Sequence, residues 1–133
     1  MLRSLKIKDF MSRDVLTLHP EMRVLDAVQL LIKKGYSGAP VLDKHGRLVG
    51  IFTERDYLRE AVQAYYHGEP GGLVNDHMST KPEHIEADQS ILTVAELFVS
   101  SRFQRYPVLD NGRLVGIISR YDIMQALARH YPT

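Results

Sequence analysis

The sequence of 133 residues contains no cysteine. This absence excludes disulfide bonds, thiolate metal sites and cysteine nucleophiles. The net charge is only +1, and no cluster of Lys or Arg forms a basic stripe, so nucleic-acid binding is not favoured. No apolar run is long enough to cross a bilayer, and the first residues do not resemble a secretion signal. Together these absences predict a cytoplasmic protein without nucleic-acid or membrane partners.

Arrangements typical of metal sites and catalytic sites are missing as well. The six histidines do not have the spacing of metal ligands on one helix face. No Ser-His-Asp set or pair of carboxylates stands where a fold would bring it together in a closed pocket. We therefore expect no catalytic residue, no metal site and no obligatory cofactor, and we expect that the protein is not an enzyme.

One block of sequence occurs twice. Residues 40–43 and 46–51, Pro-Val-Leu-Asp and Gly-Arg-Leu-Val-Gly-Ile, return at 107–110 and 112–117. A shorter match, Asp-x-Met-Ser at 9–12 and again at 76–79, begins before this block. The duplication therefore covers nearly the whole chain. We predict a first repeat over residues 1–66, a linker over 67–75 and a second repeat over 76–133.

Each repeat reads as strand, helix, strand, strand, helix. In the first repeat, residues 15–18 predict a short strand before Pro20, and an apolar stripe then predicts a helix that ends at Gly35. A hairpin follows in both repeats, and Asn111-Gly112 in the second suits a tight turn. The predicted fold class is α/β (α+β), with two βαββα repeats related by a pseudo-twofold axis and packed through their sheets.

A hydroxyl-x-x-Asp motif follows each hairpin, as Thr53-x-x-Asp56 and Ser119-x-x-Asp122. One interpretation is a capping box, in which hydroxyl and carboxylate satisfy the first N–H groups of a helix. The other is a ligand site, because a strand running into a helix start leaves N–H groups that attract phosphates. A carboxylate facing a cleft can also accept from both hydroxyls of a ribose. Both interpretations stay open, and the second predicts two related clefts.

The repeated motifs resemble a tandem pair of cystathionine-β-synthase-type (CBS) domains, also called a Bateman module. The resemblance covers essentially the whole chain, and its most specific parts are residues 40–56 and 107–122. It implies a regulatory module that binds an adenosine-containing ligand, AMP, ADP, ATP or S-adenosylmethionine, between its repeats. It also implies a homodimer and an effector protein that receives the signal.

The resemblance further implies that each cleft combines base-side segments of one repeat with the Asp motif of the other. The first cleft would contain Val15, Leu16, Thr17, Tyr36, Ser37, Gly38, Pro40, Ser119, Arg120 and Asp122. The second would contain Thr53, Arg55, Asp56, Glu83, His84, Ile85, Phe103, Gln104, Arg105 and Pro107.

Arg105 stands where related pairs often have a phosphate-binding basic residue, and a guanidinium there could bind phosphate oxygens bidentately. Gly38 occupies this position in the first repeat, so we expect unequal clefts. A solvated surface arginine is the alternative for Arg105, and a solvent-facing side chain is the alternative for Arg55 and Arg120.

A competing hypothesis is a structural or dimerisation module whose clefts are vestigial and bind no ligand. In the family that the chain resembles, such pairs associate through the helices after each hairpin. The residues that could supply that face are apolar side chains of these two helices: Tyr57, Ala61, Val62, Tyr65, Ile123, Met124 and Leu127. Core packing explains several of these residues equally well.

Overall fold

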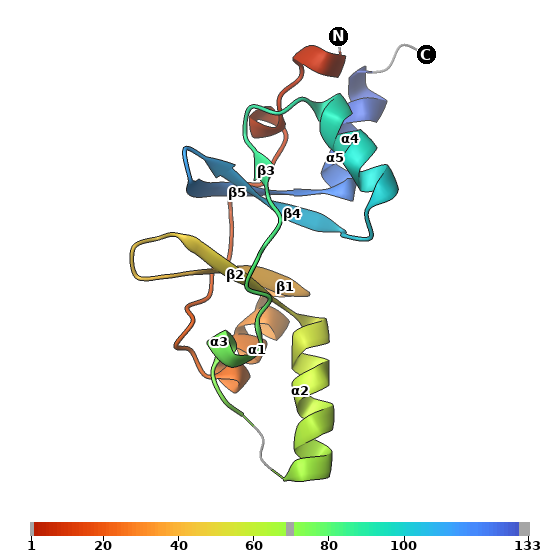
Figure 1. Cartoon of the computed structure of the whole chain (residues 1–133). Helices are drawn as coiled ribbons and strands as arrows, with labels where there is room; N and C mark the ends of the chain where they lie inside the picture. The colour runs from red at the N-terminus through yellow and green to blue at the C-terminus, as the bar shows by residue number, and fades with distance from the viewer. Residues whose placement is uncertain (1, 69–70, 131–133) are drawn as a thin grey trace. The chain divides into compact units, whose positions relative to one another are not determined.

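The computed structural model describes residues 2–68 and 71–130 (Figure 1). Two residues of the predicted linker, 69 and 70, lie outside the described residues, as do residue 1 and residues 131–133 of the predicted repeats. The structure is mixed α/β, as predicted from the sequence. Its elements in chain order are η1 (Leu2–Ser4), η2 (Ile7–Asp9), α1 (Val24–Lys34), β1 (Gly38–Leu42), β2 (Leu48–Thr53), α2 (Glu54–His67), α3 (Val74–His77), β3 (Ile85–Glu86), α4 (Ile91–Ser100), β4 (Arg105–Asp110), β5 (Arg113–Ser119) and α5 (Arg120–His130).

The chain forms two compact units, which are described separately. Unit 1 comprises Met1–Val15 and Glu83–Thr133, and unit 2 comprises Leu16–Pro82. The predicted boundaries at 66 and 76 follow the duplication along the chain, whereas each compact unit takes a short segment from the other repeat. The beginning of each repeat thus contributes to the unit that contains the hairpin of the other repeat.

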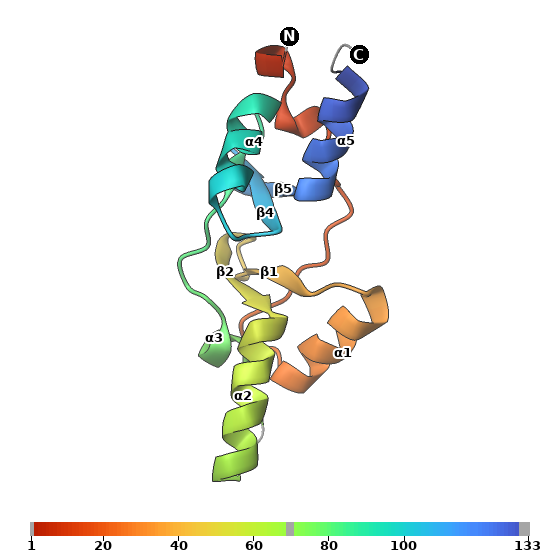
Figure 2. The ribbon, with the colours of Figure 1, turned by 90° about the vertical axis from the view of Figure 1, so that its right-hand side faces the viewer.

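Unit 2 is built on the β1–β2 hairpin, with α1 and α2 on one side of it (Figure 2). Its core consists of Leu18, Val24, Ala27, Leu31, Ala39, Val41, Phe52 and Val74, all buried. Helix α1 ends at Gly35 with φ 74°, and the Gly35 N–H donates to the carbonyls of Ile32 and Leu31. This conformation favours glycine, so the predicted C-terminal cap is confirmed.

The strand predicted at residues 15–18 is reduced to one bridge, between Leu18 and Val41 in parallel orientation. The N–H of Leu18 donates to the carbonyl of Pro40 over 2.9 Å, and the N–H of Leu42 donates to the carbonyl of Leu18 over 2.9 Å. Pro20 follows closely and lacks the N–H needed to continue such a ladder. The segment therefore lies beside β1 without forming a full strand.

Unit 1 contains a sheet in the order β3-β4-β5, with β3 parallel and β5 antiparallel to β4. Helices α4 and α5 pack together on one side of this sheet (Figures 1 and 2). The turn between β4 and β5 has positive φ at Asn111 (52°) and Gly112 (79°), which confirms the predicted tight turn. The core consists of Ile7, Ile85, Ala87, Ile91, Val94, Phe98, Tyr106, Val108, Ile118, Ile123 and Ala126.

The segments that begin the two repeats are bound in the same way. Ser12 and Ile117 exchange two backbone hydrogen bonds of 2.9 Å in unit 1. In unit 2, Ser79 and Ile51 exchange equivalent bonds of 2.9 and 3.0 Å. Each bond pair adds a short segment of one repeat to the edge of the second hairpin strand of the other, which explains why the compact units differ from the sequence repeats.

Candidate functional site

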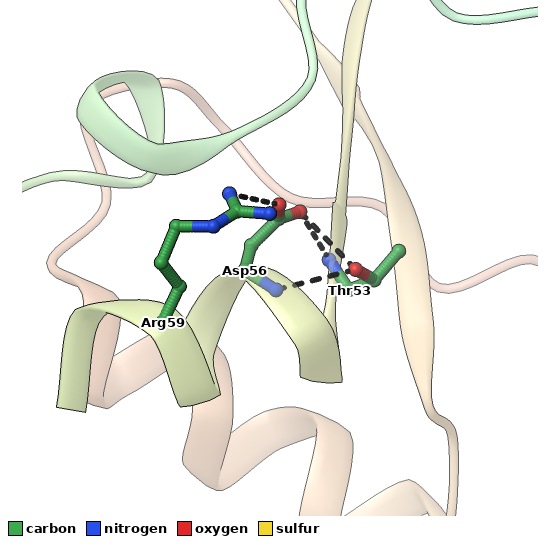
Figure 3. A network of polar contacts seen from close by, with 3 residues as sticks. All are labelled: Thr53, Asp56 and Arg59. Carbon is green, nitrogen blue, oxygen red and sulfur yellow. Dashed lines mark hydrogen bonds and ion pairs between the residues drawn. The ribbon is translucent and has the colours of Figure 1, made fainter. Parts of the chain in front are cut away.

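Both hydroxyl-x-x-Asp motifs lie where a strand runs directly into a helix. In unit 2, the N–H of Thr53 donates to Asp56 Oδ2 over 2.9 Å, and the N–H of Asp56 donates to Thr53 Oγ1 over 3.4 Å (Figure 3). In unit 1, the N–H of Ser119 donates to Asp122 Oδ2 over 2.9 Å, and the N–H of Asp122 donates to Ser119 Oγ over 3.1 Å. The capping interpretation of both motifs is therefore confirmed, and it leaves a ligand role open because a carboxylate has further acceptor sites.

The two carboxylates differ in the acceptor capacity that remains. Asp56 is only 5% exposed. Its Oδ2 also accepts from the Thr53 hydroxyl over 3.2 Å, and its Oδ1 lies 3.5 Å from Arg59 Nη1 (Figure 3). Asp122 is partly exposed, and no described residue donates to its Oδ1. Asp122 can therefore accept a further hydrogen bond as it stands, whereas Arg59 competes for the corresponding oxygen of Asp56.

A loop that precedes the hairpin contacts each helix start. In unit 2, the N–H of Glu54 donates to the carbonyl of Ser37 over 2.8 Å. In unit 1, the N–H of Arg120 donates to the carbonyl of Gln104 over 3.0 Å. These bonds place each predicted base-side loop next to the Asp motif of its own unit.

Strand register adds to this arrangement. Gly38 pairs with Thr53, and Arg105 pairs with Ser119. A Cβ on Gly38 would lie 3.0 Å from the carbonyl oxygen of Phe52 and 3.1 Å from Thr53 Cγ2, so the first repeat has little room there for a larger residue. Arg105 is exposed; it is the first residue of β4, and its strand partner Ser119 directly precedes α5.

The structure distributes the predicted site residues between the units as follows. Unit 2 contains Leu16, Thr17, Tyr36, Ser37, Gly38, Pro40, Thr53, Arg55 and Asp56. Unit 1 contains Val15, Glu83, His84, Ile85, Phe103, Gln104, Arg105, Pro107, Ser119, Arg120 and Asp122. Each unit therefore holds the base-side loop of one predicted cleft and the Asp motif of the other. The combination of residues across the two repeats stays a prediction.

The exposure of these residues separates possible contacts from core positions. Tyr36 and Phe103 are exposed at 36% and 42%, so both aromatic rings are accessible at their loops. Ile85 is 1% exposed and belongs to the core. His84 Nε2 and Glu86 Oε2 lie 2.8 Å apart on the surface, forming an exposed pair.

The side chain of Arg120 has partners that the sequence reasoning missed. Its Nε donates to the carbonyl of Phe103 over 2.9 Å, and its Nη2 donates to the carbonyl of Ser101 over 2.5 Å. One difference between the repeats could have indicated a particular role for Arg120. The equivalent position in the first repeat is Glu54, whose side chain cannot donate to carbonyls.

Two buried hydroxyls lie in or beside the same loop. Among the described residues, Ser101 Oγ and Tyr106 Oη are the buried side-chain oxygens that lack a hydrogen-bond partner. Tyr106 is 2% exposed, and its ring packs against Phe98 and Phe103 at centroid distances of 5.2 and 5.4 Å. Lys34 and Ala39 stand at the corresponding positions of the first repeat, so this cluster is particular to unit 1.

Over residues 2–68 and 71–130, no group of three or more His, Cys, Asp or Glu side chains could hold a metal ion. Within the same part of the chain, every helix is too short or too polar to cross a membrane.

Comparison with known proteins gives consistent matches. The family model described as CBS domain matches residues 7–63 and 74–129. Protein MJ1426 of Methanocaldococcus jannaschii is 30% identical over 155 aligned residues, covering 91% of this chain and 90% of its own length. Protein MJ1225 of the same organism is 27% identical over 121 residues, and the chain spans 42% of it. The chain also spans 24% of that organism's inosine-5'-monophosphate dehydrogenase, at 31% identity over 128 residues.

Two solved structures match over nearly their full length. The crystal structure of CBSX2 in complex with AMP has a TM-score of 0.82 at 29% identity, covering 94% of this chain and 97% of that chain. The CBS domain pair of protein MJ0100, in complex with 5'-methylthioadenosine and S-adenosyl-L-methionine, has a TM-score of 0.75 at 26% identity, covering 93% and 96%. The predicted fold class, α/β with two repeats, is confirmed.

Proposed function

This chain belongs to the CBS domain family, and from that premise we propose that it is a regulatory module that binds an adenosine-containing nucleotide and signals to a partner protein. It acts by binding rather than by catalysis. The observation that carries the proposal is the start of α5, where Asp122 keeps one carboxylate oxygen without a donor among the described residues. Support comes from the relatives CBSX2 and MJ0100, whose structures contain AMP and S-adenosyl-L-methionine.

The chemistry of the α5 start suits such a ligand. A ribose hydroxyl would donate to Asp122 Oδ1, because a charge-assisted hydrogen bond is among the stronger polar contacts available to a sugar. The exposed Phe103 ring offers an apolar face to adenine. Arg105, paired with Ser119 across the hairpin, would bind phosphate oxygens, and the N-terminal end of α5 adds a favourable dipole.

The start of α2 would form a second and weaker site. Thr53 and Asp56 repeat the motif, with Tyr36 in the adjacent loop. Gly38 provides no cation where the other site has Arg105, and Arg59 competes for Asp56 Oδ1. We therefore propose unequal sites, with the tighter one at Asp122. Residues of the segments before each loop, Leu16 and Thr17 or His84, are the further candidates for contact with the base.

Binding is tested by calorimetry and thermal unfolding with AMP, ADP, ATP and S-adenosylmethionine, with GMP as the base control. At least one adenosine ligand should raise the Tm by mass action. Asp122→Asn should weaken the tighter site, and Asp56→Asn the weaker one. If none of the four ligands binds at roughly millimolar concentration, the proposal is wrong.

A double-mutant cycle distinguishes sites made within a unit from clefts combined across repeats. The variants are Arg105→Met, Asp122→Asn, Asp56→Asn and the two doubles that contain Arg105→Met. Residues that contact one ligand give non-additive changes in binding free energy. Coupling of Arg105 with Asp122 supports a site within one unit, whereas coupling with Asp56 supports the cleft predicted from the sequence.

A second candidate function is a dimerisation module without a ligand, and exposed apolar side chains favour it. On α2, Leu58, Val62, Tyr65 and Tyr66 are 59%, 57%, 83% and 74% exposed. Met124 on α5 is 57% exposed. Ile123, a candidate for the same face or for the core, is 4% exposed in the core of unit 1, so it belongs to the core. We propose a homodimer through α2, which is compatible with ligand binding.

A further inference from the structure

We infer that Arg120 is a positioning residue: its guanidinium holds the loop at residues 101–104 in place, and so determines the affinity of the site at Asp122. The inference rests on the proposed function, because it concerns the loop that would contact the nucleotide. It assigns to Arg120 a role through the protein's own backbone instead of a direct role on phosphate.

Arg120 connects three parts of unit 1. It is the first residue of α5, and it donates to the carbonyls of Ser101 and Phe103 over 2.5 and 2.9 Å. Its guanidinium carbon also lies 5.9 Å from the centre of the Phe98 ring, within the range of a cation–π contact. A planar guanidinium can make these contacts at the same time, whereas an ammonium group cannot reproduce the fork.

The carbonyls that Arg120 binds lie in the loop after α4, and that of Ser101 follows directly on the end of the helix. Helix α4 ends at Ser100, and Ser101 then has extended dihedral angles, φ −97° and ψ 163°. Carbonyl groups at a helix C-terminus lack helical partners and favour a nearby cation. The buried Ser101 Oγ adds no hydrogen bond to the loop. Arg120 is therefore a principal tie between this loop and the rest of unit 1.

The first repeat holds its equivalent loop by other means. Helix α1 ends at Gly35, whose N–H donates to the carbonyls of Leu31 and Ile32, and the N–H of Tyr36 also donates to Leu31 over 2.9 Å. This glycine cap uses backbone groups alone. In the second repeat Arg102 replaces the glycine, and Arg120 replaces Glu54. The equivalent loops are thus fixed by different groups: in unit 2 by backbone N–H groups at a glycine that bind the last turn of α1, and in unit 1 by a side chain that binds carbonyls after the end of α4.

This arrangement has a consequence for binding. Phe103 and Arg105 belong to the loop and to the strand that follows it, so a loose loop would have to be ordered at the moment of binding. Ordering each mobile side chain or loop residue weakens association. Loss of Arg120 should therefore weaken the Asp122 site while Asp122 and its cap are intact.

Amide hydrogen exchange of the protein without nucleotide measures the loop. Two amides report on its ends: Ser101, bonded to the Leu97 carbonyl, and Arg120, bonded to the Gln104 carbonyl. In Arg120→Met, which keeps an apolar side chain but has no donor, both should exchange about tenfold faster. Glu54, bonded to Ser37 in unit 2, should not change. Arg102→Met, an exposed arginine of the same loop, is the matched control and should leave all three amides unchanged.

Titration with AMP measures the effect on binding. Arg120→Met should weaken AMP binding at the Asp122 site by roughly two- to tenfold, and should leave the Asp56 site unchanged. Arg120→Lys should recover only part of the affinity. The double variant Arg120→Met with Arg102→Gly restores the glycine cap of the first repeat and should recover both slow exchange and affinity.

The outcomes separate the two proposals. Wild-type protein that binds no adenosine ligand overturns the proposed function and with it the effect of the loop on affinity, while hydrogen exchange still decides whether Arg120 holds the loop. Wild-type binding with unchanged exchange and unchanged affinity in Arg120→Met overturns the inference and leaves the proposed function standing. Weakened binding in Arg120→Met with unchanged exchange also overturns it, because Arg120 would then contact the ligand directly.

Discussion

Gly116 lies directly against Met11 in unit 1. A Cβ built on Gly116 would come within 2.6 Å of Met11 Sδ and within 2.8 Å of the carbonyl oxygen of Ser12. Gly50 has the same relationship to Met78 in unit 2, at 2.6 Å to Sδ. The absence of a side chain at these two positions is what allows the first segment of each repeat to pair with the hairpin of the other.

We expect Gly116→Ala to destabilise the protein by about 1–3 kcal/mol, because overpacking forces backbone and side chains to move. Urea denaturation measures the change. Adding Met11→Ala should recover part of the loss, since it removes the sulfur contact but leaves the Ser12 carbonyl in place. If Gly116→Ala has the stability of the wild type, the close approach between Gly116 and Met11 is contradicted.

Substitutions at Asp122 should separate its capping role from its ligand role. Asp122→Ala removes the acceptor for the Ser119 N–H and should cost about 1 kcal/mol of stability. Asp122→Asn keeps an acceptor oxygen and should lose less stability. Both variants should weaken nucleotide binding, because the negative charge is gone. Thermal unfolding without ligand and calorimetry with AMP give the two readouts. If Asp122→Asn binds AMP with the wild-type affinity, Asp122 caps the helix and does not bind the ligand.

Removing the Tyr106 hydroxyl should not destabilise the protein. A buried hydroxyl without a hydrogen bond costs about 1–3 kcal/mol, and no described residue bonds to Tyr106 Oη. We therefore expect Tyr106→Phe to equal or exceed the wild type in chemical denaturation without ligand. Tyr106→Leu, which also removes the ring contacts with Phe98 and Phe103, should be clearly less stable. A large loss in Tyr106→Phe would mean that the hydroxyl has a stabilising partner.

A charge placed on the exposed face of α2 should reduce self-association. Val62→Glu buries a carboxylate if that face forms the dimer, and an unpaired buried charge is strongly unfavourable. Sedimentation over a range of protein concentrations compares this variant with Gln63→Glu, which adds the same charge at a neighbouring exposed position of the helix. A wild-type protein that stays monomeric throughout would rule out the dimer.

The hairpin turn of the first repeat should be sensitive to acid. The N–H of Arg47 donates to Asp43 and lowers the pKa of this carboxyl below its usual value, and the N–H of His45 adds to the effect. Because the folded-state pKa is lowered, the stabilisation is complete above the unfolded-state pKa and is lost as the pH falls through the folded-state value. An NMR titration of the Asp43 carboxyl carbon measures this. A midpoint at or above that of an unstructured aspartate would contradict the prediction.

Much of the fold could be predicted because its determinants are local. The positive φ at Asn111-Gly112 and the cap at Gly35 follow from what single residues allow. The capping boxes at Thr53 and Ser119 follow from residues three apart in sequence. Because the two repeats have matching sequences, an element predicted in one repeat could also be predicted in the other.

Contacts between distant residues could not be predicted in this way. The sequence leaves Ile123 open between a dimer face and the core, because apolar character alone does not say which partner covers a residue. In the structure Ile123 lies in the core of unit 1. For Arg120 the sequence indicates a solvent-facing or ligand-binding side chain. Its carbonyl partners lie 17 and 19 residues earlier, too far along the chain for a local pattern to reveal them.

The sequence by itself determined the duplicated elements, their turns and the positions of the two acidic helix starts, because these depend on backbone preferences and short-range hydrogen bonds. Only the tertiary structure decided which hairpin the first segment of each repeat pairs with, which Asp oxygen has no donor among the described residues, and what Arg120 binds. Those outcomes depend on close packing between segments far apart in the chain, and that packing is a property of the folded arrangement.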